Sequence, residues 1–406
     1  MKASTALSKL AIDGGRPVRT SAFAPWPSFS QDEIETASNV LASGRVNYWT
    51  GDHGRAFEQE FAASIGSQHA VAVANGSVAL ELALHAFGIG AEDEVIVSSR
   101  SFIASASCVL MRGARPVFAD VDRDSGNVTA ENIRPLLSPR TRAILAVHLG
   151  GWPCEMEEIV ALAREHNLKV IEDCAQAQGA TLNGKPVGSF GHAAAFSFCQ
   201  DKIMTTGGEG GMLVTNDESA FKRAWSYKDH GKDFDLANRN EHSSQFRWLH
   251  HSAGTNWRMA EMQSALGRLM LPKIAERIRR RRHNAAILDD AFAQIPSLRV
   301  ARPPAHTSSA YYRYYVYLRP EKLARDWTRD RVQAVIEAEG IPCFSGSCSE
   351  IYLEKAFPPE LRPPERLPIG RELGDTSLAF LVHPTLTDED MRDTTAAVEK
   401  VMQHAS

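Results

Sequence analysis

Short apolar runs alternate with helical segments between residues 69 and 216, and this alternation constrains the fold more than any other feature of the chain. Helical periodicity separates several of the runs, as at 78–88 and 155–167. Apolar strands joined through helices indicate βαβ units, whose right-handed crossovers build a mostly parallel sheet buried on both faces. The expected strands are residues 69–74, 94–98, 116–122, 142–149, 168–173, 193–198 and 211–216.

The flanking patterns divide the chain into three parts. Residues 1–30 are expected to form an irregular arm, anchored by Phe23 and Trp26. Residues 31–275 then form a large three-layer α/β domain, and residues 276–406 form a smaller C-terminal α+β domain. The elements expected in the smaller domain are a strand at 311–318 and helices at 327–340 and 386–403.

Bulk composition limits the class of function. A chain of 406 residues with 43% hydrophobic residues can bury a large core without disulfides or metals. The net charge of −4 gives no global field for nucleic acid or an anionic membrane, and no run of about 18 apolar residues predicts a membrane span. A basic run at 276–284 is interpreted as a solvated helix face rather than a nucleic-acid patch.

Cysteine and histidine usage adds two expectations. The six cysteines form no CxxC pair, and the N-terminus lacks the apolar core of a signal peptide, so reduced thiols and a cytoplasmic location are expected. The 14 histidines show no metal-ligand spacing, and no metal site is predicted.

Two local motifs lie at the ends of expected strands. Asn75, Gly76 and Ser77 stand where a strand passes into a helix, and a helix N-terminus offers free N–H groups to a phosphate. The same residues could be a plain N-cap. Glu172 and Asp173 end another strand, at the sheet edge where open α/β sheets bind ligands. A carboxylate there could pair with a cationic ring nitrogen or simply cap the loop.

A lysine provides the third motif. Lys202 follows the apolar run 193–198 and precedes a glycine-rich stretch at 207–211. A lone lysine is usually a surface residue, but the glycines imply tight backbone turning beside it. The segment 254–259, with Asn256, is a fourth motif and leads into a long helical stretch that begins near Met259 and runs to 284.

The ordered set of motifs resembles the DegT–StrS family of sugar aminotransferases, which are pyridoxal 5'-phosphate (PLP) enzymes of fold type I. The resemblance runs from about Phe57 to the C-terminal helix. It rests on EDEVIVSSRSFIASAS (92–107), GARPVFADVD (113–122), VIEDCAQAQGA (170–180), FSFCQDK (196–202), GEGGMLVTND (208–217), DHG (229–231) and NWRMAEMQSALG (256–267).

The resemblance assigns the ring of the cofactor to four residues. Lys202 would bind the aldehyde covalently through its amine and later move a proton. Asp173 would pair with the pyridine nitrogen and favour its protonated form. Gln176 would hydrogen-bond the ring hydroxyl, and Phe102 would stack on the ring face.

The phosphate is assigned to the other matching positions. Gly76, Ser77 and Ser197 would bind it within one subunit, and Asn256 would reach the phosphate of the neighbouring subunit. The resemblance therefore implies a homodimer with shared active sites.

The implied reaction has two halves. Glutamate or glutamine would convert the cofactor to pyridoxamine phosphate (PMP). PMP would then aminate a keto-sugar that is linked to a nucleotide, and the product would serve polysaccharide or natural-product synthesis. Inosose (cyclitol) amination and aminohydroxybenzoate synthesis remain alternatives, as does a non-catalytic regulatory protein. The related PMP-dependent sugar dehydratases carry His where this chain has Lys202.

This chain departs from the family pattern beside the lysine. Gln200 and Asp201 replace commoner residues, one residue is added before Glu209, and Arg100 stands where Thr or Ala is common. These differences could reshape the substrate side of the site. Tyr311, Tyr312 and Arg313 form part of an aromatic run. They either line the substrate pocket or pack in a core or at an interface.

Overall fold

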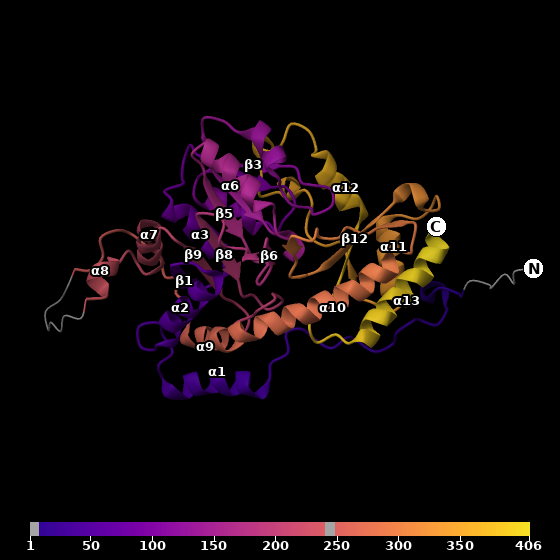
Figure 1. Cartoon of the computed structure of the whole chain (residues 1–406), viewed down its shortest axis with the longest axis horizontal. Helices are drawn as coiled ribbons and strands as arrows, with labels where there is room; N and C mark the ends of the chain where they lie inside the picture. Colours follow the sequence, from indigo (N-terminus) through magenta and orange to yellow (C-terminus); the bar gives the residue numbers. More distant parts are fainter. Residues whose placement is uncertain (1–7, 240–247) are drawn as a thin grey trace, which may run out of the picture.

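The computed structural model describes residues 8–239 and 248–406, and its main element is a seven-stranded sheet of order β1-β9-β8-β5-β4-β2-β3 (Figure 1). Six strands are parallel, and β9 runs antiparallel to both of its neighbours. The strands are β1 (His69–Val73), β2 (Glu94–Ser98), β3 (Arg115–Ala119), β4 (Thr141–Val147), β5 (Lys169–Asp173), β8 (Ala193–Ser197) and β9 (Gly211–Thr215). The predicted parallel α/β sheet is confirmed.

Helices cover both faces of this sheet because its strands are apolar on both sides. Val71 and Val73 face one core with α3 (Gly76–Ala86), while Ala70 and Ala72 face another with α2 (His53–Ile65). The first face also packs α4 (Ala104–Met111) and α7 (Glu218–Lys228). The opposite face packs α6 (Met156–Glu165) and the start of α10 (Ile274–Phe292). The arrangement is the predicted three-layer sandwich.

A second, four-stranded antiparallel sheet lies in the C-terminal part, in the order β10-β12-β14-β13. Its strands are β10 (Leu298–Arg299), β12 (Tyr314–Leu318), β13 (Cys343–Phe344) and β14 (Ser377–Phe380). The helices α10, α11 (Arg329–Ala338) and α13 (Asp388–Ala405) pack with it in a separate core. Figure 1 shows α10 running beneath both sheets, with α13 beside it. The division at residue 275 stays a prediction, since α10 contributes to both cores.

The remaining elements are short or peripheral. They are α1 (Gln31–Ser43), α5 (Ala130–Ile133), α8 (Phe234–Ala237), α9 (Glu261–Met270), α12 (Pro368–Thr376) and a three-stranded sheet of β6 (Thr181–Leu182), β7 (Lys185–Pro186) and β11 (Thr307–Ser308). None of the helices within 8–239 and 248–406 is both long and apolar enough to cross a bilayer.

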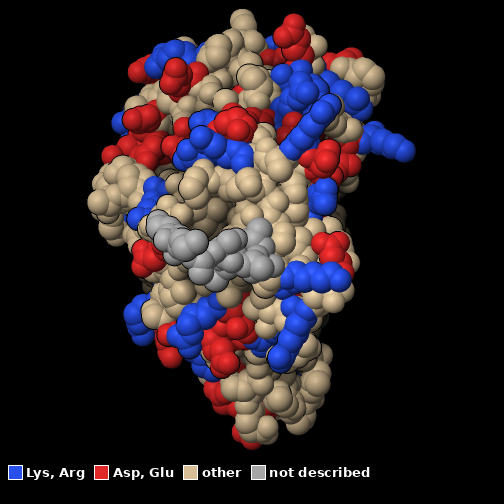
Figure 2. All heavy atoms as spheres, turned by 90° about the vertical axis from the view of Figure 1, so that its right-hand side faces the viewer, with Lys and Arg blue, Asp and Glu red and all other residues tan. Residues whose placement is uncertain are grey.

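Two sequence expectations differ from the structure here. The long helical stretch from Met259 is broken at Leu271–Lys273, where Pro272 cannot donate an N–H to the preceding turn. The basic run is not a wholly solvated face, because Arg281 is fully buried and donates to the Tyr311 and Tyr312 carbonyls. On the face shown in Figure 2, basic and acidic side chains are intermixed rather than gathered in a stripe of one sign.

Over residues 8–30 the predicted arm is irregular apart from one 3-10 turn at Ala11–Asp13. Both predicted anchors are in place: Phe23 packs against the C-terminal core, and the indole N–H of Trp26 donates to the Lys202 carbonyl at 3.0 Å. The arm thus contacts the backbone of the predicted lysine through Trp26.

Candidate active site

The predicted site residues gather at one edge of the main sheet. Parallel strands present their carboxyl ends on the same side, and β5 ends there at Asp173 while β8 ends at Ser197. The N-terminus of α3 also lies at this edge, because Gly76 packs directly on Ser197. Lys202 follows β8 after one turn closed by its N–H and the Cys199 carbonyl at 3.1 Å.

The start of α3 is shaped to bind a phosphate. Asn75 caps the helix by accepting from the Val78 N–H at 3.0 Å, which leaves the N–H groups of Gly76 and Ser77 unpaired within the described chain. A Cβ on Gly76 would lie only 2.6 Å from the Ser197 Cβ, so glycine is needed for the close approach. Ser77 is exposed, and the Ser197 hydroxyl stands beside it at the same helix end. These donors fit an anion.

Asp173 is a buried carboxylate with neutral partners only. It is 5% exposed, accepts from the Ser105 hydroxyl at 2.7 Å and from the Ala175 N–H at 3.1 Å. No lysine, arginine or histidine among the described residues forms an ion pair with it. Buried carboxylates are normally paired with a cation, so this position fits a cofactor that presents a protonated ring nitrogen.

Ser105 was not anticipated from the sequence. It lies on α4, bonded to Asp173 on one side and at 2.6 Å from the Ser101 hydroxyl on the other. Ser101 lies before the start of α4, so no helical spacing in the sequence links the two serines.

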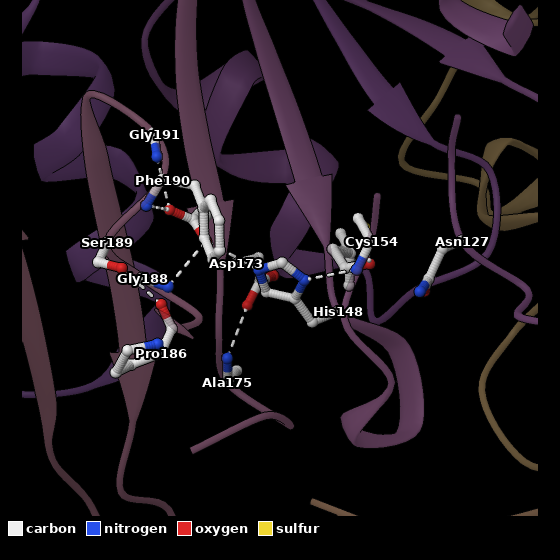
Figure 3. A network of polar contacts seen from close by, with 12 residues as sticks. Asn127, His148, Cys154, Asp173, Ala175, Pro186, Gly188, Ser189, Phe190 and Gly191 are labelled. Carbon is white, nitrogen blue, oxygen red and sulfur yellow. Dashed lines mark hydrogen bonds and ion pairs between the residues drawn. The ribbon is translucent and has the colours of Figure 1, made fainter. Parts of the chain in front are cut away.

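A buried network beneath Asp173 holds the strand ends together (Figure 3). The Glu172 carboxylate accepts from the N–H groups of Gly188, Phe190 and Gly191 at 2.7 to 2.8 Å. His148 Nε2 lies 3.1 Å from Glu172 Oε2. Since His148 Nδ1 accepts from the Cys154 N–H, the proton must be on Nε2, which donates to Glu172.

The same network bears on the question of a metal. His148, Glu172 and Cys174 place ligand atoms within 4.8 Å of one another. Both nitrogens of His148 are already engaged, one as acceptor and one as donor. A metal would have to break one of these buried hydrogen bonds, so the cluster is better explained as a structural support for β4 and β5.

Gln176 is fixed by the turn that follows β4. Its Oε1 accepts from the Gly150 N–H at 2.7 Å, which leaves the two amide N–H groups as the remaining donors of this side chain. The Gly150 and Gly151 carbonyls in turn accept from Tyr312 and Ala310 at 2.8 and 2.9 Å. The segment before β12 is therefore attached to the same turn as Gln176.

The Lys202 side chain contacts Tyr312, in the segment before β12. Its Nζ lies 3.5 Å from the Tyr312 hydroxyl and 4.5 Å from the centre of that ring. The Tyr312 hydroxyl donates to Asp201, which also pairs with Arg313 at 3.4 Å. Burial raises the pKa of Tyr312 well above its usual range, with Asp201 adding to the rise, so the phenol keeps its proton. Tyr312 and Arg313 are thus brought to the lysine.

Phe102 and Asn256 both lie at the surface of the isolated chain. Phe102 stands between β2 and α4 with 65% of its surface exposed, so its ring is accessible to a ligand. Asn256 is exposed and pairs with Asp229 through a β-bridge. The next residue, Trp257, accepts from the Ala74 N–H at 2.8 Å, so Asn256 lies beside the end of β1 in its own subunit.

Four further polar side chains lie at different places relative to the lysine. His383 stacks on Trp26 at 6.2 Å, close to Lys202, whereas His53 lies at the start of α2 and contacts Arg268. Ser347 hydrogen-bonds Tyr315 at 3.2 Å. Arg100 is fully buried against Tyr315 and Tyr317, with its Nε and Nη2 unpartnered among the described residues.

A three-layer α/β domain with a lysine, a buried unpaired carboxylate and an anion-binding helix end at one sheet edge defines a PLP-dependent aminotransferase of fold type I. The model of the DegT/DnrJ/EryC1/StrS aminotransferase family matches residues 27–399, and the chain belongs to this family. The predicted family, fold and cofactor are confirmed.

Three proteins illustrate what this chain is similar to in sequence and structure. The crystal structure of an aminotransferase from Psychrobacter cryohalolentis is 52% identical, with a TM-score of 0.92 over 94% of this chain and 99% of that one. GDP-perosamine synthase of Caulobacter vibrioides is 37% identical over 87% of this chain and 92% of its own. L-glutamine:2-deoxy-scyllo-inosose aminotransferase of Streptomyces fradiae is 32% identical over 98% of this chain and 99% of its own.

Proposed function

We propose that this aminotransferase moves an amino group from glutamate or glutamine to a keto-sugar that is linked to a nucleotide. The observation that carries the proposal is Lys202, which follows β8 at the same edge of the sheet as the buried carboxylate of Asp173 and the N-terminus of α3. The nucleotide link is supported by the name of the GDP-perosamine synthase. The product would serve polysaccharide or natural-product amino-sugar synthesis.

Four residues would hold the ring of the cofactor. PLP, when bound, supplies an electron sink that stabilises negative charge on the substrate carbon. Lys202 would attach the cofactor and, once released, carry a proton on Nζ. Asp173, held by Ser105, would keep the ring nitrogen protonated, since no cationic side chain among the described residues pairs with it. Gln176 would donate to the ring hydroxyl and Phe102 would cover one ring face.

Phosphate binding would use the α3 N-terminus and a neighbouring subunit. Gly76 and Ser77 would donate backbone N–H groups, and Ser77 and Ser197 would add their hydroxyls. Asn256, exposed beside its own β1 end, would complete the site of a partner in a homodimer. We place the protein in the cytoplasm, where its cysteines, buried except at Cys199 and Cys348, would stay reduced.

A half-reaction screen tests the proposal. Enzyme loaded with pyridoxamine phosphate is mixed with candidate nucleotide keto-sugars, and return of the absorption of the lysine-bound cofactor is followed. We expect return with a nucleotide keto-sugar and none in the Lys202→Ala variant. Absence of any response to keto-sugars, together with a response to another ketone, would refute the proposed acceptor.

A cyclitol ketone is the second candidate acceptor. The full-length match to the 2-deoxy-scyllo-inosose aminotransferase supports it. The same screen separates the two, because an inosose carries no nucleotide. Faster return with the inosose than with every nucleotide keto-sugar would favour this alternative.

A further inference from the structure

Beyond the cofactor residues, the site contains an excess of positive charge beside Lys202. Arg281, fully buried, has Nε and Nη2 unpartnered within the described chain, and Arg313 is 20% exposed at the side chain. Burial, followed by the nearby charges of Arg281 and Arg313, lowers the pKa of His383 to about 3, so that ring is neutral. Asp201 is the one carboxylate that pairs with Arg313 among the described residues. This group of side chains therefore favours an anion.

We infer that Arg313 binds the α-carboxylate of the amino donor, and that Asp201 takes its place as partner when the keto-sugar is bound. The inference rests on the proposed function, since it presumes an amino-acid donor. It adds a recognition element on the substrate side of the lysine, which the cofactor residues do not supply.

The position of Arg313 relative to the reacting amine supports this assignment. The Lys202 Nζ lies 4.5 Å from the centre of the Tyr312 ring, and the Arg313 guanidinium carbon lies 4.7 Å from the same point. Both cations therefore contact the same ring. The amine and carboxylate of an α-amino acid are attached to one carbon, so a carboxylate-binding group must lie close to the position of the reacting nitrogen.

The Tyr312–Arg313 segment is also rigidly held. Tyr312 donates its N–H to the Gly150 carbonyl at 2.8 Å, and the Gly150 N–H donates to Gln176. Arg281 adds bonds of 3.2 and 3.3 Å to the Tyr311 and Tyr312 carbonyls. A guanidinium on such a segment is pre-organised for a planar carboxylate.

The Asp201 contact explains how one pocket can accept two unlike substrates. A sugar ketone has no carboxylate next to its reacting carbon, so it would leave a fixed arginine at that position uncompensated, which is costly in a partly buried site. Asp201 is 44% exposed and touches Arg313 through one contact of 3.4 Å, a weak pairing that a bidentate carboxylate can displace. The resident aspartate thus keeps the arginine neutralised during the sugar half of the cycle.

The test compares the two half-reactions in holoenzyme variants. In Arg313→Gln, we expect the glutamate or glutamine concentration for half-maximal rate to rise by about 30-fold or more, because a charge-assisted pair is lost. The half-saturating concentration of the keto-sugar should change by less than about threefold. Arg313→Lys keeps the charge without the fork and should fall between wild type and Arg313→Gln.

Asp201→Asn is the matched control. It removes the competing carboxylate while its carbonyl can still accept from Tyr312, so donor affinity should be unchanged or improved. Glutarate, which has carboxylates but no amine, should bind wild-type holoenzyme in calorimetry and bind Arg313→Gln about 30-fold more weakly.

Four results separate the possibilities. An unchanged donor requirement in Arg313→Gln, or equal losses in both half-reactions, would overturn the inference. So would a loss of donor affinity in Asp201→Asn like that in Arg313→Gln. If wild-type enzyme accepts neither glutamate nor glutamine, the proposed donor itself is wrong, and this is seen before any variant is made.

Discussion

Replacing Gly76 with alanine tests the phosphate site by steric displacement alone. An ideal Cβ on Gly76 lies 2.6 Å from the Ser197 Cβ, 3.0 Å from its hydroxyl and 3.1 Å from its Cα. Carbon atoms prefer to be about 3.5–4.0 Å apart, so the helix end must move by roughly 1 Å. The contacts involve backbone and Cβ atoms, which cannot rotate away.

Overpacking of this kind costs about 1–3 kcal/mol, and every 1.4 kcal/mol changes affinity about tenfold. We therefore expect the Kd of Gly76→Ala for PLP to rise by roughly 5- to 150-fold, measured by titrating apoenzyme and following cofactor absorption. Gly90→Ala is the matched control. Its Cβ would meet only the Arg112 carbonyl oxygen, at 3.7 Å, so its Kd should equal that of wild type.

A double variant decides whether the clash is the cause. Ser197→Gly removes the Cβ that Gly76→Ala strikes, although it also removes a proposed phosphate ligand. The loss of affinity in the double variant should be smaller than the two single losses combined. Additive losses, or a Kd for Gly76→Ala within twofold of wild type, would refute the packing argument.

Three further changes test other parts of the site. Asp173→Asn should still bind PLP but slow the donor half-reaction by at least about 100-fold in stopped-flow absorbance, because the charge beside the ring nitrogen is lost; a normal rate would contradict the assigned role. Glu172→Gln should lower the free energy of unfolding by about 3 kcal/mol, measured by urea titration, because the new amide N–H group faces backbone N–H donors. An unchanged unfolding midpoint would count against a stabilising role of the Glu172 network. His383 has its pKa lowered from 6.5 to about 3, chiefly by burial, so the unfolded chain binds more protons between these values and stability should rise with pH across this window. His383→Gln should flatten that rise by up to about 1.4 kcal/mol per pH unit, as measured by urea unfolding at several pH values.

The main sheet could be predicted because its strands are short apolar runs with helices between them. The expected runs at 94–98, 193–198 and 211–216 match β2, β8 and β9 to within one residue at either end. The direction of β9 could not be read from the sequence, because a strand buried on both faces looks the same whichever way it runs. The strand expected at 311–318 begins only at Tyr314, since Tyr311 has a positive φ of 48°.

Within the site, local motifs located the strand ends but not their partners. Asp173 and Lys202 could be selected because each directly follows an apolar strand. Ser105 and Trp26 contact them across 68 and 176 residues of sequence, and no periodicity reports such pairs. The buried position of Arg281 was missed for the same reason, because the carbonyls that it binds lie 30 and 31 residues further along the chain.

This division follows from what each group of residues must do. A cofactor site of this kind needs a strand end, a helix start and a lysine. A short local motif of a few consecutive residues determines each of these features. The substrate side instead depends on Tyr312 and Arg313, which reach Lys202 and Asp201 only when β12 docks on the turn at Gly150. Substitutions in that docked segment could therefore change the substrate while the cofactor residues stay constant. The departures at Asp201 and Arg100 lie on this variable side, where specificity has to be tested.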